Sequence, residues 1–184
     1  MDENKILFVD LDGTLIKEDL SNLAFSHSLK NNPLQTVFYL LVYLFKGKPY
    51  LKYKISRNFE IPFENLTFNK AAFDFIREVK NRHRVVYLIS GSHQILVDQI
   101  GKYLNIFFET FGTRDNFNMV GNNKVRFIKE NLKIHDFDYL GNSHKDLPIW
   151  KYTKRAIHTN ASQELVENIK SQNLENKDIP ANFS

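Results

Sequence analysis

The sequence predicts an α/β fold: a Rossmann-like parallel sheet flanked by helices on both faces, with a small helical cap inserted after the first strand. The first observation is that short apolar runs of strand length alternate with amphipathic helical stretches from residue 70 onwards. The second is that polar residues follow several of these runs directly, as they do at the carboxyl ends of parallel strands. The 184 residues, 42% of them hydrophobic, suffice for one domain with a sizeable core.

The predicted strands are the apolar runs at 6–9, 83–89, 107–111, 137–140 and 156–159. The predicted helices lie between them, at 70–81, 93–104, 124–132, 146–150 and 163–169. Asn69 is suited to begin the first of these helices, because its side chain can accept a hydrogen bond from a free backbone N–H. The last stretch, 171–184, has no periodicity and is expected to be a flexible tail.

The insertion is predicted to be mainly helical. One helix begins near Asp19 or Ser21, a second begins at Pro33 and ends at Gly47 and Pro49, and a third piece follows over 50–58. The expected organisation is therefore a core of two segments, a helical cap between them and a tail, at 1–16 with 69–170, 17–68 and 171–184.

The positive charge is concentrated in this insertion. The net charge is +4, but the stretch from Leu20 to Phe59 has six basic residues and no acidic one, so the remainder sums to −2. The apolar run 37–45 is too short to span a membrane, which takes about 20 residues. Two interpretations stay open: a buried helix of a small subdomain, or an interfacial helix whose flanking cations contact anionic lipid head groups, namely Lys46, Lys48, Lys52, Lys54 and Arg57.

The composition also limits the environment and the chemistry. There is no cysteine, which excludes disulfides, thiolate zinc sites and cysteine nucleophiles. The polar N-terminus lacks the layout of a secretory signal, so a cytoplasmic location is expected, with peripheral contact at the inner face of the membrane if the insertion is interfacial. No nucleic-acid partner is expected.

The most informative stretch is Asp10-Leu11-Asp12-Gly13-Thr14-Leu15, directly after the first strand. Gly13 allows the chain to turn, so that both carboxylates can face one small volume beyond the sheet. Two such acids repel each other unless a divalent cation, a shared proton or a lysine is near. The alternative is a plain turn with two solvated acids.

Other polar residues are expected to join this pair. Ser90-Gly91-Ser92 follows the second strand and Asn142 to Asp146 follow the fourth, while Lys124 begins a helix between them. Since the carboxyl ends of parallel strands meet at one edge, these residues should converge there.

The order of these motifs resembles that of the haloacid dehalogenase-like (HAD) phosphohydrolases, over nearly the whole chain to about residue 166. The resemblance implies that Asp10 is the nucleophile that forms an aspartyl-phosphate and that Asp12 is the general acid and base. It further implies a phosphate site and a Mg²⁺ site. The phosphate site would comprise Ser90, Gly91, Ser92, Lys124 and Asn142, and the Mg²⁺ site Asp10, Asp12, Asn142 and Asp146. Most relatives have Asp where this chain has Asn142, so weaker Mg²⁺ binding is expected.

A narrower resemblance rests on the stretch 141–150, on 156–162, and on Asn32-Pro33 and Lys46-Gly47-Lys48. These resemble the HAD domain that precedes UbiA-type prenyltransferases, which implies a sugar-phosphate or polyprenyl-linked phosphate as substrate and a membrane enzyme of that type as partner. The alternatives are a phosphoserine-phosphatase-like enzyme acting on a soluble metabolite, and a weakly catalytic module that docks on a membrane or partner.

Overall fold

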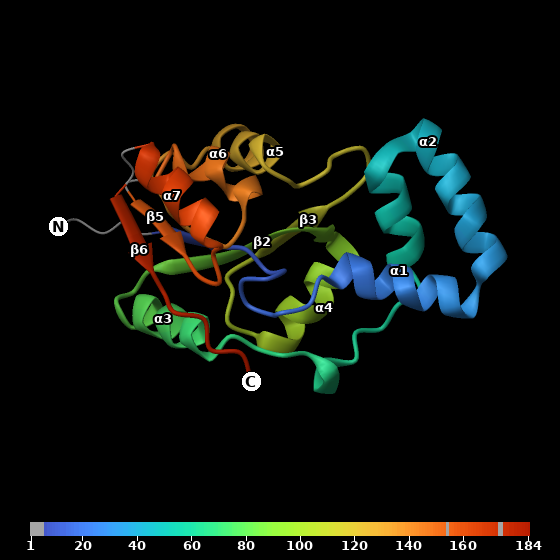
Figure 1. Ribbon diagram of the computed structural model, residues 1–184, viewed down its shortest axis with the longest axis horizontal. Coiled ribbons are helices and arrows are strands. Elements are labelled where there is room, and N and C mark those ends of the chain that lie inside the picture. The colour runs from blue at the N-terminus through green and yellow to red at the C-terminus, as the bar shows by residue number, and fades with distance from the viewer. Residues whose placement is uncertain (1–5, 154, 173–174) are drawn as a thin grey trace.

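The structure is a computed structural model that describes residues 6–153, 155–172 and 175–184. Its centre is a six-stranded sheet in the order β3-β2-β1-β4-β5-β6, in which every neighbouring pair is parallel. The strands are β1 (Ile6–Val9), β2 (Val85–His93), β3 (Thr110–Thr113), β4 (Asp138–Gly141), β5 (Arg155–His158) and β6 (Glu175–Asp178). The predicted α/β fold with a parallel sheet is confirmed (Figure 1).

Helices cover both faces of this sheet, and each face has its own apolar core. One core includes residues of α3 (Lys70–Asn81) and α4 (Gln94–Leu104). The other includes residues of α5 (Asn122–Arg126), α6 (Leu147–Trp150) and α7 (Gln163–Ser171). Short 3-10 turns lie at Phe63–Asn65 and His144–Asp146, and a π-helical turn at Phe127–Asn131 continues α5.

The central strand β1 belongs to both cores because side chains alternate across a strand. Leu7 and Val9 pack into one core and Phe8 into the other, and all three are fully buried. Gly13 follows with a φ of +78°, and a Cβ there would lie 2.2 Å from Nδ2 of Asn142. The turn after β1 therefore requires glycine, both for its backbone conformation and for its close approach to the loop after β4.

The prediction of a flexible tail over 171–184 is wrong for its described parts, 171–172 and 175–184, since Ser171 ends α7 and a strand begins at Glu175. Strand β6 pairs with β5 and forms an edge of the sheet. The chain then returns to the start of α3, where the backbone of Phe68 exchanges two hydrogen bonds with that of Ser184. The strand Glu-Asn-Lys-Asp has no apolar periodicity, so the sequence gives no sign of it. Backbone hydrogen bonds attach it to the sheet, and such bonds do not depend on the side chains.

Three other boundaries differ from the predicted ones. Strand β2 continues through Ser90-Gly91-Ser92 to His93, with a register shift against β3 after Ile89. Strand β3 begins at Thr110 instead of residue 107, and the helix predicted over 124–132 is a short α5 followed by the π turn. In each case backbone pairing or local backbone geometry sets a boundary that apolar periodicity alone does not record.

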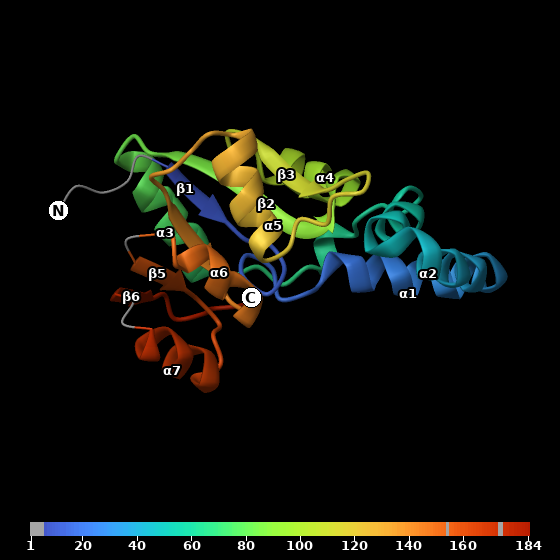
Figure 2. The ribbon, with the colours of Figure 1, turned by 90° about the horizontal axis from the view of Figure 1, so that it is seen from above.

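Residues 20–56 form a pair of helices, α1 (Leu20–Asn31) and α2 (Pro33–Ser56), called the helical hairpin below. The side chain of Asp19 accepts a hydrogen bond from the amide of Asn22 and begins α1 as predicted. A break in α2 at Gly47, with φ 76° and ψ −178°, confirms the predicted interruption there. Figures 1 and 2 both show the hairpin extending to one side of the sheet. Across the described ranges of the chain, no helix is long and apolar enough to cross a membrane.

Candidate active site

A cavity of about 500 Å³ lies between the carboxyl ends of the central strands and the helical hairpin. Its core side includes Asp10, Asp12 and Lys124. The facing side is formed by side chains of the hairpin, among them Tyr43 and Lys52. The cavity thus lies at the strand ends where the sequence predicts polar residues, and its lining is both polar and apolar.

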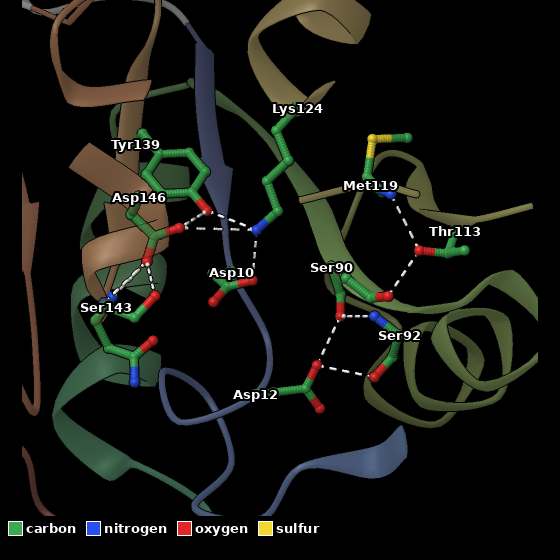
Figure 3. Close-up of polar contacts among 12 residues, drawn as sticks. Asp10, Asp12, Ser90, Ser92, Thr113, Met119, Lys124, Tyr139, Ser143 and Asp146 are labelled. Atoms are coloured by element: carbon green, nitrogen blue, oxygen red, sulfur yellow. Dashed lines mark hydrogen bonds and ion pairs between the residues drawn. The ribbon is translucent and has the colours of Figure 1, made fainter. Parts of the chain in front are cut away.

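Asp10 lies on the core side of the cavity and is 7% exposed. Its Oδ1 accepts a hydrogen bond of 2.7 Å from Nζ of Lys124, and this lysine is itself 4% exposed (Figure 3). The Asp10 amide donates to the carbonyl of Leu140, which fixes the residue to the end of β4. Residues 114 positions apart in sequence therefore form a buried ion pair.

Tyr139 extends this pair to a third charged group. Its hydroxyl accepts a 2.7 Å hydrogen bond from Nζ of Lys124 and donates a 2.7 Å hydrogen bond to Oδ1 of Asp146. The other oxygen of Asp146 accepts hydrogen bonds from the amides of Asn142 and Ser143 and from the Ser143 hydroxyl. Lys124 thus stands between two carboxylates, 2.7 Å from Asp10 and 3.9 Å from Asp146.

The electrostatics of this group follow from its burial. Desolvation raises the pKa of Asp10 to about 7; Lys124 opposes this shift, and the negative charges of Asp146 and Asp12 add to it. Burial, with Asp146 and Asp10 close by, also raises the pKa of Tyr139 well above its ordinary value. The tyrosine hydroxyl therefore keeps its proton and acts as a donor to Asp146.

Asp12 has a different set of partners. Its Oδ1 accepts a hydrogen bond from the amide of Leu20 at 2.8 Å, and its Oδ2 accepts from the hydroxyls of Ser90 and Ser92 at 2.8 and 2.9 Å. Burial and the charge of Asp19 raise the pKa of Asp12, although these three hydrogen bonds oppose the shift. A raised pKa favours the protonated carboxyl that a proton donor needs.

The structure brings most of the predicted site residues to one cavity. The cavity is lined by the predicted residues Asp10, Asp12, Gly91, Ser92, Lys124, Asn142 and Asp146. Ser90 is fully buried behind them, and its hydroxyl donates to Asp12 and accepts from the amide of Ser92. In this state the Ser90 hydroxyl is occupied by Asp12.

The oxygen atoms of this region fit a hard divalent cation. Among the residues that the structure describes, no three acidic or histidine side chains are grouped so as to hold a metal ion. However, Oδ1 of Asn142 is buried without a hydrogen-bond partner and belongs to the same cavity as the carboxylates of Asp10 and Asp146. Two carboxylates and an unpaired amide oxygen suit Mg²⁺, which prefers oxygen ligands and keeps several waters.

The sequence analysis missed two residues of this site. Tyr139 lies within an apolar strand and shows no polar pattern, so its bridging role has no signal in the sequence. Lys52 does have a signal in the sequence, since Lys48 and Lys52 are four residues apart and so share a helix face. Nζ of Lys52 donates to the carbonyl of Gly91 at 2.6 Å and to Oδ1 of Asn118 at 2.8 Å, which connects the hairpin to the core. Burial lowers the pKa of Lys52 to about 8.

A parallel sheet with an aspartate pair, a lysine and a further carboxylate in a cavity at its carboxyl edge has the arrangement expected of an α/β enzyme, whose ligands bind at that edge. A family model described as haloacid dehalogenase-like hydrolase matches residues 7–151. The chain belongs to this family, and the predictions of a HAD-type hydrolase and of its fold are confirmed.

The chain is also similar to individual proteins. The uncharacterized protein y4nM of Sinorhizobium fredii (strain NBRC 101917 / NGR234) is 29% identical over 151 residues, which cover 82% of this chain. The matched region spans only 29% of that protein. A protein of unknown function from Bordetella pertussis Tohama I has a similar structure, with a TM-score of 0.70 and 14% identity over 97% of this chain and all of that one.

A second similar structure is that of a phosphoserine phosphatase described as a phospho-aspartyl intermediate analogue. Its TM-score is 0.58 at 22% identity, and the match covers 90% of this chain and 91% of that one. At these identities, both solved structures establish the likeness of the fold.

Proposed function

We propose that this protein is a Mg²⁺-dependent phosphomonoester hydrolase that acts through an aspartyl-phosphate intermediate. The observation that carries the proposal is the buried Asp10–Lys124 pair at 2.7 Å, on a cavity that also contains Asp12. A carboxylate attacks phosphorus when nearby cations reduce its repulsion from the phosphoryl oxygens, and Lys124 is placed to do so.

In the first step, the Asp10 carboxylate forms a bond to phosphorus while the bond from phosphorus to the ester oxygen breaks. Because Oδ1 of Asp10 accepts the Lys124 hydrogen bond, Oδ2 is the oxygen assigned to the attack. Asp12 gives its proton to the departing ester oxygen, which leaves as an alcohol. In the second step Asp12 takes a proton from water, the water oxygen bonds to phosphorus, and the Asp10 carboxylate is released.

Gly91 and Ser92 are proposed to hold the phosphoryl oxygens together with Lys124, and Ser90 to join them once its hydroxyl leaves Asp12. Asp10, Asp146, Asn142 and the backbone carbonyl of Asp12 are proposed to hold Mg²⁺, which would supply positive charge beside the phosphoryl group. Because Asn142 provides an amide oxygen in place of a carboxylate, the site has one negative charge fewer, and weaker Mg²⁺ binding is expected.

The helical cap, residues 17–68, is proposed to select the leaving group. Its cavity side chains combine cations, Lys48 and Lys52, with the apolar Phe25 and Leu51. The apolar side chains suit an apolar leaving group, as in a polyprenyl-linked phosphate, and the cations suit a polar leaving group that carries a further anionic group, as in some sugar phosphates. A phosphoserine-like soluble metabolite would use the cations alone. We also propose a UbiA-type membrane enzyme as the partner, either as a separate chain or within one longer chain.

The test is hydrolysis of an aryl phosphate with and without Mg²⁺, followed by acid quench and mass spectrometry of the peptide that contains Asp10. We expect Mg²⁺-dependent phosphate release, a phosphorylated Asp10 after the quench, and a loss of at least about a thousandfold in kcat for Asp10→Asn. Asp74→Asn, an exposed aspartate of α3, is the matched control and should retain full activity. Activity that survives in Asp10→Asn, or that needs no metal, would contradict the mechanism.

A panel of sugar phosphates, lipid-linked phosphates and phosphoserine then separates the substrate classes by kcat/KM. A preference for phosphoserine over the apolar substrates would overturn the proposed role of Phe25 and Leu51.

A further inference from the structure

The first arm of α2, residues 33–46, exposes an apolar face to solvent. Its large apolar side chains are exposed by 49% to 91%, with Phe45 and Leu34 at the upper end. They follow helical spacing and so lie on one side of the arm, and we call them the apolar stripe: Leu34, Val37, Phe38, Leu41, Leu44 and Phe45. The interpretation of residues 37–45 as a buried helix is therefore wrong. A contiguous exposed apolar patch of this kind marks an interaction surface.

The arm holds this orientation because its opposite face is packed against α1. Thr36 is fully buried, and its hydroxyl shares a 2.7 Å hydrogen bond with the hydroxyl of Ser28. Tyr39 is 7% exposed. The inward face thus contains polar and aromatic contacts within the hairpin, and the outward face contains the apolar stripe.

The position of the arm leaves the stripe accessible. Figures 1 and 2 show the first arm of α2 as the outermost element at the end of the molecule opposite β5 and β6. The chain enters and leaves the hairpin from the core side. No described element covers the outer side of this arm in either view.

The charge around the stripe is positive. The hairpin has no acidic residue between Leu20 and Phe59, and exposed lysines, Lys30 and Lys46, lie just before and just after the stripe in sequence. Nearby in space, Arg114 and Asp115 of the core line a hollow with Phe45 and Lys46, and their charges offset each other. An apolar helix face with cations at its ends and no acidic residue complements a layer of anionic head groups above an apolar interior.

We infer that the apolar stripe docks this protein on the surface of an anionic lipid bilayer. The arm, about 18 Å long over its 12 stripe positions, lies in the interface plane with the stripe in the acyl boundary. Lys30 and Lys46 contact the anionic head groups. Tyr43 and Lys48, which line the catalytic cavity, belong to the same helix, so docking brings the cavity close to the bilayer. This inference goes beyond the proposed hydrolysis and does not depend on it.

The test is co-sedimentation of the full chain with vesicles at low salt. We expect the protein to sediment with vesicles of phosphatidylcholine that contain phosphatidylglycerol, and to stay in solution with pure phosphatidylcholine. The double variant L44S/F45S should reduce the partition coefficient about tenfold or more, because two apolar side chains no longer enter the bilayer. The double variant K30Q/K46Q should reduce it about tenfold and weaken its salt dependence.

The matched control is F108S, which removes a phenylalanine that is 72% exposed on the core and should bind like the unaltered protein. Thermal unfolding of all variants should be unchanged, because the substituted side chains are exposed. The inference is overturned if the unaltered protein does not bind anionic vesicles at low salt, or if L44S/F45S binds equally well. A third result would also overturn it: the unaltered protein is a dimer in sedimentation velocity, L44S/F45S is a monomer, and neither protein binds vesicles. The stripe would then join two copies of the chain.

Discussion

Asp10 and Asp12 lie two residues apart on one turn, yet they have opposite kinds of partner. Asp10 is paired with a cation, Lys124, at 2.7 Å. Asp12 accepts hydrogen bonds from two serine hydroxyls and from the amide of Leu20, which are neutral groups. Burial raises the pKa of both. The comparison teaches that identical side chains in one motif acquire different surroundings from the elements that meet them. These surroundings support the two proposed roles, a nucleophile beside a lysine and a proton donor beside hydroxyls.

Replacing Asp12 should separate the two roles most clearly. In Asp12→Asn the amide oxygen can still accept from Ser90 and Ser92, but no proton can be given to the leaving group. We expect the rate of the first step, transfer of the phosphoryl group to Asp10, to fall about 10²- to 10⁴-fold with an alkyl phosphate, whose leaving group needs a proton. With a nitrophenyl phosphate this step should slow much less, because nitrophenolate leaves without a proton, although kcat still falls because the second step loses its base. Single-turnover release of the leaving group from both substrates measures the difference, and an equal slowing of the first step with both would refute the role of Asp12 as acid.

Tyr139 provides a second way to test the comparison, because it acts on the Asp10 side alone. Tyr139→Phe keeps the direct Lys124–Asp10 contact but removes the hydroxyl that joins Lys124 to Asp146. We expect the free energy of unfolding to fall by about 1–3 kcal/mol, because buried groups lose a hydrogen-bond partner, and kcat to fall about tenfold. Urea unfolding and initial rates measure the two effects.

The control for this change is Tyr103→Phe, at a tyrosine that is 54% exposed, which should change neither quantity. Combined with Asp12→Asn, the loss in kcat should be additive in free energy, since the side chains of Tyr139 and Asp12 share no hydrogen-bond partner within the described part of the chain. A loss that disappears in the Asp12→Asn background would show that the two halves act as one unit.

The fold was largely predictable from the sequence, and its exceptions have physical causes. Strand β1 is a short, buried apolar run and helix α3 buries one apolar face, so the hydrophobic pattern identifies both. Strand β6 has the polar sequence Glu-Asn-Lys-Asp and pairs through its backbone, which periodicity does not detect. The first arm of α2 is the opposite case, because its apolar sequence suggests burial but its apolar side chains are exposed to solvent. A hydrophobic pattern alone does not show what an apolar helix face contacts.

The candidate site was predictable to the extent that motifs mark strand ends. Asp10, Asp12, Lys124 and Asp146 follow strands or begin a helix at the carboxyl edge, and the structure gathers them there. The partnership of each residue was not predictable, because the contacts join positions up to 114 residues apart. Ser90 illustrates this: the family resemblance implies that it is a phosphate ligand, whereas its hydroxyl is bonded to Asp12.

Lys52 should give the smallest effect, and it tests whether the Asp12 side also depends on a cation. The negative charges of Asp12 and Asp19 favour its protonated form, but burial outweighs them and lowers its pKa to about 8. The ammonium is therefore present at pH 7 and is lost as the pH rises through about 8. If Lys52 attracts the anionic substrate, KM should rise across this range, and Lys52→Gln should have a KM about threefold to tenfold higher at pH 7 with kcat nearly unchanged. The rise with pH should be absent in Lys52→Gln and present in Lys54→Gln, a lysine of the same helix whose ammonium lies over tyrosine rings instead. A pH-independent KM in the unaltered protein would show that Lys52 only attaches the hairpin to Gly91 and Asn118, and that the Asp12 side works with neutral partners alone.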